Sequence, residues 1–134
     1  MDITRVLPDA SYSLAKMLYT RRVAKKPVWK YLFVASYLSY CLSGKAACDE
    51  SLACRSLLYD VKANCWSKPL LDASGIAQAQ LPEVIPAGGV IGTILPELAA
   101  QFGLRTDVKI VSGCHDQIVN ALAAGVCACG EAVD

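Results

Sequence analysis

The amino-acid sequence predicts an α/β fold that is rich in helices and has a few strands. The clearest indication is residues 108–111, whose β-forming side chains are typical of a buried strand. A Gly-containing break at 112–113 follows, and from 116 to 125 the apolar residues return at helical spacing. A second short strand is predicted at 90–93, after a turn-rich loop that begins at residue 81.

Two helices are predicted near the start of the chain. Apolar residues at i, i+3 and i+4 spacing predict an amphipathic helix over 11–22, with a serine as its N-cap. Pro27 ends this helix and allows a second one to run from about residue 28 to residue 42. Gly44 then has the place of a C-terminal helix cap.

The rest of the chain contains further predicted elements. The segment 49–60 fits either a helix or an extended chain, and its periodicity does not decide between them. Prolines near the first turn and glycines at the end predict helices over 66–75 and 96–103. Residues 130–134 have the composition of a strand.

Composition and charge exclude several functional classes. The chain has 134 residues, of which 54% are hydrophobic and 19% charged, and its formal net charge is +1. We therefore expect no nucleic-acid partner, since the basic residues near 21–26 form one short cluster that is typical of a solvated helix end. The first five residues do not begin a signal peptide, and the longest apolar run, 31–42, is too short to span a bilayer, so we expect no membrane partner.

The seven cysteines are odd in number and irregular in spacing. This pattern favours a reduced, cytoplasmic protein over a disulfide scaffold. With His115 as the single histidine, a zinc site would need scattered thiolates, so we expect no metal; a thiol-rich module held by zinc remains an alternative. The cysteines are Cys41, Cys48, Cys54, Cys65, Cys114, Cys127 and Cys129.

Asp116 follows the predicted strand and turn, at the carboxyl edge of a sheet where α/β proteins bind ligands. Its carboxylate is either a proton acceptor or a helix N-cap bonded to backbone N–H groups. Several such bonds would make it a weaker base.

Several short motifs follow one another along the chain. Taken together, their order and spacing resemble those of the FGGY carbohydrate kinases, although Tyr19 stands where that family usually has Trp and Ser36 where its common pattern has Asp. The motifs are Ser11-x-Ser13-x-x-Lys16-Met17-x-Tyr19, Ser36-Tyr-Leu-Ser-Tyr-Cys-Leu-Ser-Gly44, Asp49-x-Ser-x-Ala-x-Arg-Ser-Leu-Leu-Tyr-Asp60 with Trp66, Leu81-Pro-Glu-Val with 88–92, and Gly113-x-x-Asp116-Gln117.

The resemblance implies a partial actin-like, or ribonuclease H-like, domain and a role for Asp116. In that family the matching Asp is the general base that takes the proton from a sugar or polyol hydroxyl as it attacks the γ-phosphate of ATP. The resemblance also implies that Gln117 contacts substrate hydroxyls. His115 borders the pocket, either as a substrate ligand or as a space-filling side chain. Ser11 lies near the place of a substrate-contacting Tyr of glycerol kinase.

The resemblance covers only the later part of the family's N-terminal domain. No phosphate loop or adenosine-binding domain is recognised within the 134 residues, and Gly88-Gly89 lacks the Lys and Ser/Thr of a P-loop. We therefore expect ATP and Mg²⁺ to belong to the parent enzyme and the isolated chain to bind neither and to be inactive. We also expect self-association through uncovered apolar surface. The alternative is a non-catalytic sugar-binding or oligomerising remnant.

Overall fold

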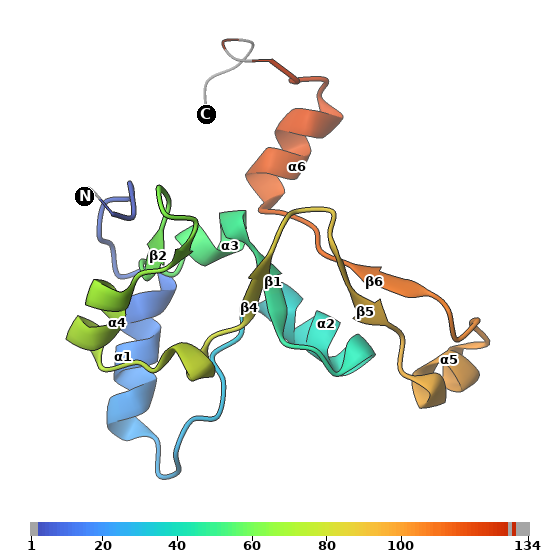
Figure 1. Cartoon of the computed structure of the whole chain (residues 1–134), viewed down its shortest axis with the longest axis horizontal. Coiled ribbons are helices and arrows are strands. Elements are labelled where there is room, and N and C mark those ends of the chain that lie inside the picture. Colours follow the sequence, from blue (N-terminus) through green and yellow to red (C-terminus); the bar gives the residue numbers. More distant parts are fainter. Residues whose placement is uncertain (1–2, 129, 131–134) are drawn as a thin grey trace.

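The computed structural model describes residues 3–128 and residue 130, and shows short strands surrounded by helices (Figure 1). The first helix is α1 (Ser13–Val23), and an extended connection leads from it to α2 (Val34–Ser43). The prediction of a serine N-cap for α1 is wrong, because Tyr12 holds that position and no side chain among the described residues caps the helix. Gly44 follows α2 with φ 73°, a left-handed conformation that glycine adopts without steric cost, and its N–H is bonded to the Tyr40 carbonyl. The end of α2 predicted from Gly44 is therefore confirmed.

A parallel pair of strands lies at the centre of the chain. The strand β1 (Ala47–Asp49) pairs with β4 (Glu83–Ile85), with Cys48 opposite Val84. A parallel pair requires a crossover connection. Here the connection contains α3 (Glu50–Cys54), the hairpin of β2 (Tyr59–Asp60) and β3 (Cys65–Trp66), α4 (Lys68–Ser74) and the 3₁₀ turn η1 (Gln78–Gln80).

The second half of the chain forms an antiparallel pair beside β1 and α2. The strand β5 (Val90–Thr93) pairs with β6 (Lys109–Val111), and α5 (Pro96–Phe102) lies in the connection between them. The final helix α6 (Asp116–Ala123) follows β6 and projects from the body of the molecule in Figure 1. The predicted strands and the two helices after them are thus confirmed within one or two residues.

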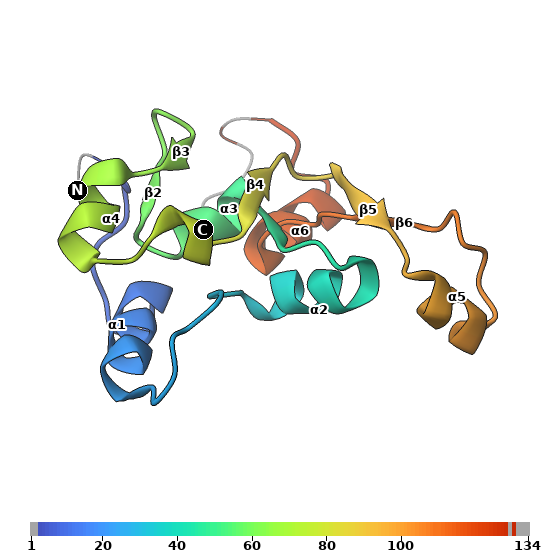
Figure 2. The same cartoon turned by 60° about the horizontal axis from the view of Figure 1, so that its bottom comes forward.

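The apolar core joins α1, α3, α4 and the β2–β3 hairpin, which lie together in both views (Figure 2). Tyr59 and Trp66 meet edge to face with ring centroids 5.6 Å apart, and the Trp66 indole N–H donates to the Pro82 carbonyl at 3.0 Å. Cys48 of β1 belongs to this core, and Val84 of β4 packs against it. Its buried members are Met17, Cys48, Ala53, Leu58, Tyr59, Trp66, Leu71, Ile76 and Leu81.

Two predictions about this region are wrong. The second helix begins at Val34 and not near residue 28, because Val28 and Tyr31 bond to Gln80 instead. The Tyr31 N–H donates to the Gln80 carbonyl, and the Gln80 side chain donates to the Val28 carbonyl, both at 2.8 Å. The predicted loop after residue 81 contains β4, which the pairing with β1 holds extended between two prolines.

The segment 49–60, for which a helix and an extended chain were both predicted as alternatives, contains first a helix and then a strand. It forms α3 as far as Cys54 and becomes extended at Tyr59, after Leu57 has adopted the left-handed φ of 64°. The predicted strand at 130–134 lies outside the described residues, except for Gly130. Among the described residues, no helix has the length and apolar character needed to cross a membrane.

The position of Cys48 in β1 has a testable consequence. Its side chain is 2% exposed, and burial, together with the neighbouring Asp49 carboxylate, raises the pKa of the thiol to about 12. We expect iodoacetamide at pH 8 to alkylate the exposed Cys41 and Cys65 and to leave Cys48 unmodified in the native chain, because the thiolate is the reacting form. Peptide mass spectrometry measures this, with alkylation in urea as the control in which Cys48 must react.

Candidate active site

The candidate site lies at the turn that joins β6 to α6. Backbone bonds to the loop between β4 and β5 fix the end of β6: the Gly88 N–H donates to the Ser112 carbonyl at 2.9 Å, and the Ser112 N–H donates to the Gly89 carbonyl at 2.8 Å. Gly113 and Cys114 follow, and His115 is the N-cap residue of α6. Asp116 is therefore the first residue of the helix.

Asp116 presents its carboxylate to solvent, with 77% of the side chain exposed. Its Oδ1 accepts the backbone N–H of Gln117 at 2.8 Å and lies 3.1 Å from Nδ1 of His115. The interpretation of Asp116 as an N-cap is wrong, because His115 holds that position and contributes no side-chain cap. We expected Asp116 to be a weaker base if several backbone N–H groups bonded to its carboxylate. In the described part of the structure only the Gln117 N–H does so, and that reason for a weak base does not apply.

His115 is fixed by a chain of hydrogen bonds that begins in β1. Its backbone N–H donates to Oγ of Ser51 at 2.8 Å, and the Ser51 hydroxyl donates to the carboxylate of Asp49. The Asp49 carboxylate, at the end of β1, also accepts the N–H groups of Ser51 at 2.9 Å and Leu52 at 3.2 Å and so caps α3. The start of α6 is consequently tied to β1 and α3.

The sequence analysis gave no role to Asp49 and Ser51, although both belong to the motif over 49–60. Asp is a preferred N-cap, so the sequence did indicate that Asp49 could cap a short helix. The Ser51 hydroxyl also accepts the N–H of His115, 64 residues later in the chain, and no local sequence pattern indicates such a bond.

The remaining predicted residues lie in different places. Gln117 is exposed on the first turn of α6, next to Asp116. Ser11 lies before α1, where its N–H donates to Asp9 and its carbonyl accepts Lys16. In both views α3 lies between α1 and α6 (Figures 1 and 2), and no hydrogen bond or ion pair in the described part of the chain joins Ser11 to residues 115–117. The structure thus brings together His115, Asp116 and Gln117, and leaves Ser11 apart.

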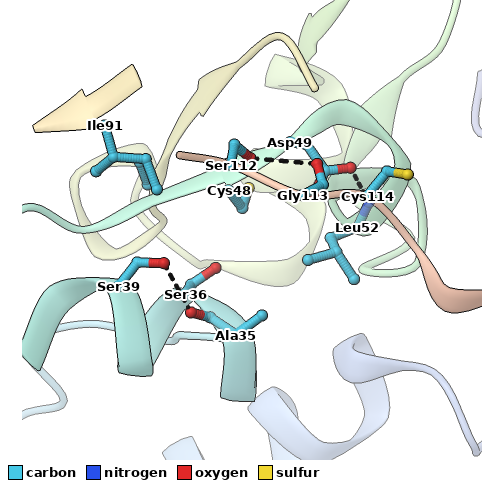
Figure 3. Close-up of a pocket in the computed structure, with 11 residues that line it drawn as sticks. Ala35, Ser36, Ser39, Cys48, Asp49, Leu52, Ile91, Ser112, Gly113 and Cys114 are labelled. Carbon is cyan, nitrogen blue, oxygen red and sulfur yellow. Dashed lines mark hydrogen bonds between the residues drawn. The ribbon is translucent and has the colours of Figure 1, made fainter. Parts of the chain in front are cut away.

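A small cavity of about 50 Å³ lies behind the turn (Figure 3). It is lined by Ser36 and Ser39 of α2, by β1, and by residues 112–114. It reaches the segment that leads into α6 without including the Asp116 side chain. Within residues 3–128 and 130, no three His, Cys, Asp or Glu side chains are grouped so that they hold a metal ion.

Comparison with known proteins identifies the fold and the family. The family model described as "FGGY family of carbohydrate kinases, N-terminal domain" matches residues 4–123. The chain belongs to the FGGY family of carbohydrate kinases. The resemblance inferred from the short motifs is thereby confirmed, and so is the α/β, actin-like fold of a partial FGGY N-terminal domain.

Individual FGGY relatives agree with this assignment. A xylulose kinase of Lactococcus lactis is 29% identical over 130 residues, which are 94% of this chain and 26% of the relative. An L-fuculokinase of Escherichia coli is 30% identical over 95 residues, which are 71% of this chain and 20% of the relative. The crystal structure of a xylulose kinase from Rhodospirillum rubrum matches with a TM-score of 0.87 and 23% identity, over 96% of this chain and 27% of that one.

The FGGY chain described here spans about a quarter of the length of curated relatives that it matches, 23% of one and 26% of another. The matched region is the N-terminal domain of the family. The match extends to residue 123, so it includes the turn with His115, Asp116 and Gln117.

The bond between His115 and Ser51 predicts the effect of a single substitution. Ser51→Ala removes the acceptor of the His115 N–H and a donor to buried Asp49, so we expect a loss of about 1–2 kcal/mol in the free energy of unfolding. Urea denaturation measures this loss, and amide exchange of His115 should become faster. The matched control is Ser74→Ala, whose hydroxyl makes only local bonds, donating to the Leu71 carbonyl and accepting the Ile76 N–H. Equal effects of the two variants would contradict the role of Ser51.

Proposed function

We propose that the complete protein transfers the γ-phosphate of ATP to a hydroxyl of a sugar or polyol, with Asp116 as the general base. The observation that carries the proposal is the position of Asp116, an exposed carboxylate at a strand-to-helix turn of an FGGY domain. The relatives named xylulose kinase and L-fuculokinase support the class of substrate, a small sugar.

The proposed reaction needs one group that accepts the proton of the attacking hydroxyl. As the substrate oxygen bonds to the γ-phosphorus, the bond from that phosphorus to ADP breaks, and the hydroxyl proton passes to the Asp116 carboxylate. Both contacts of Asp116 within the chain use Oδ1, so we assign the proton to Oδ2. Positioning the hydroxyl is the larger part of catalysis in phosphoryl transfer.

The neighbouring residues receive supporting roles in this proposal. Gln117 is assigned to substrate hydroxyls because its side chain is exposed on the same turn as Asp116. His115 either donates to the substrate or fills the wall of the pocket, and its contact with Asp116 at 3.1 Å supports a place in the site. Ser11 stays a proposed substrate contact of the complete enzyme, and within the described residues its own hydrogen bonds go to Asp9 and Lys16.

ATP and Mg²⁺ are assigned to the complete enzyme and not to this segment. The described residues offer no group of three metal-ligating side chains, so no part of a Mg²⁺ site is derived from them. We propose that the parent acts in the cytoplasm, where the free thiols of residues such as Cys41 and Cys65 stay reduced. The isolated 134-residue chain is proposed to be inactive.

The role of Asp116 is tested in the complete protein. We expect Asp116→Asn to lower kcat for ATP-dependent sugar phosphorylation by about 10²–10⁴-fold, because an amide does not accept the proton, and to leave sugar binding largely intact. A coupled assay for ADP release measures kcat, and calorimetry measures the binding of sugar. The control is Asp107→Asn, an exposed carboxylate paired with Arg105 away from the turn.

Activity of Asp116→Asn close to that of the unchanged enzyme would exclude Asp116 as the base. Phosphorylation by the isolated 134-residue chain would separately overturn the proposal that this segment is inactive. Sugar-dependent NMR shifts of residues 115–117 without ATP, together with an inactive complete protein, would favour the alternative of a sugar-binding remnant.

The exposed apolar face of α6 supports the alternative of an oligomerising remnant. No residue of α6 is buried, and Ile118, Val119 and Leu122 are 50, 44 and 62% exposed. Val111 on the adjoining strand is also 49% exposed. We propose that this apolar face of α6 binds a second copy of the chain, because exposed apolar surface of this kind is usually covered.

Self-association of the isolated chain is tested with a charge on each side of α6. Leu122→Glu places a charge in the apolar face, so we expect the dimer to dissociate and the average mass in sedimentation equilibrium to fall toward that of a monomer. Asn120→Glu adds the same charge to the opposite side of the helix and should leave association unchanged. A monomer at every concentration of the unchanged chain would exclude the proposal.

A further inference from the structure

One buried side chain in the described part of the chain is unsatisfied and faces a cavity. Ser36 on α2 is 2% exposed, and its hydroxyl has no hydrogen-bond partner among residues 3–128 and 130. Figure 3 shows the hydroxyl pointing away from α2 toward β1, at the cavity of about 50 Å³ behind the turn. Burying a hydroxyl without a hydrogen-bond partner costs free energy. Its position beside this cavity therefore indicates a ligand that supplies the missing hydrogen bond.

The size and lining of the cavity define that ligand. A buried water needs a cavity of roughly 10–15 Å³ and two to four polar partners. The cavity exceeds this volume, and three serines line it: Ser36, Ser39 and Ser112. The Ser39 hydroxyl donates to the Ala35 carbonyl at 3.0 Å, and the Ser112 hydroxyl donates to the Gly113 carbonyl at 3.4 Å, so the lone pairs of both remain available.

The other walls argue against larger or charged ligands. The Cys48 thiol is protonated at neutral pH, since burial raises its pKa to about 12, and it supplies no anionic sulfur. Oδ1 of Asp49 is already bonded to Ser51 and Leu52. Leu52 and Ile91 complete the lining with apolar surface.

We propose that this cavity is a binding site for buried water, with the Ser36 hydroxyl as its principal partner. The water bridges α2 to β1 and to residues 112–114, the segment that leads into α6. Ser36 is thereby a positioning residue for the turn, which it reaches through the water and not by direct contact. The proposal concerns the folded chain itself and does not rest on the proposed kinase function.

The first experiment is a crystal structure of the 134-residue chain at a resolution that shows ordered water. We expect density within hydrogen-bond distance of Ser36 Oγ, and we expect Ser36→Asn to replace that density with its own amide group. A Ser36 hydroxyl that rotates onto a protein acceptor, with no density in the cavity, would overturn the proposal.

The second experiment compares the two buried hydroxyls that lack partners in the described chain. Ser67, at the N-cap of α4, is 3% exposed, lacks a partner like Ser36, and does not line the cavity. We expect Ser36→Ala to raise the equilibrium constant for unfolding about five-fold and to speed amide exchange at Gly113 and Cys114. Ser67→Ala should do neither.

Both measurements have a defined negative result. If Ser36→Ala and Ser67→Ala change the unfolding constant equally and leave exchange at 113–114 unaltered, Ser36 has no water-mediated role. Should the alanine variant fail to fold, water-to-protein magnetisation transfer in the unchanged chain replaces it. A long-lived water signal at the Gly113 amide supports the site, and its absence refutes it.

Discussion

The buried carboxylate of Asp49 is the constraint on which the arrangement of this segment depends. Its side chain is 1% exposed, and burying a charge is costly unless hydrogen bonds compensate it. Compensation comes from the first N–H groups of α3 and from the Ser51 hydroxyl. Because Ser51 uses its proton on Asp49, its lone pairs accept the N–H of His115. The hydrogen bonds that satisfy this buried carboxylate therefore also hold His115, the residue that precedes α6.

The same constraint explains why α6 is held at one end. Its N-terminus is tied to Ser51, whereas its body has no buried residue and projects from the strands in Figure 1. A side chain at the first helical position, such as Asp116, thus has a defined place while remaining open to solvent. Sites supported by rigid elements in this way keep their geometry better than sites on loops.

The sequence predicted elements whose signals are local. Proline near the start and glycine at the end identify α4 and α5, and β-forming residues followed by Gly113 identify β6 and the turn before α6. It missed β1 and β4, because each is short and is a strand only through pairing with a partner distant in the chain. At the candidate site, the place of Asp116 after a strand was predicted, but the hydrogen bonds from Asp49 and Ser51 that support the turn depend on the tertiary fold.

The exposure of Asp116 connects the proposals about this chain. Phosphoryl transfer requires that water be kept from the reacting groups, and a carboxylate that is 77% exposed lacks such a cover. In the proposed enzyme the cover must come from another part of the polypeptide, and the apolar face beside Asp116, with Ile118 and Leu122, is suited to pack against it. A second copy of the isolated chain would compete for that same face. The proposed activity and the proposed self-association therefore use the same surface. The proposed water is compatible with either, because its cavity lies on the side of the turn toward α2.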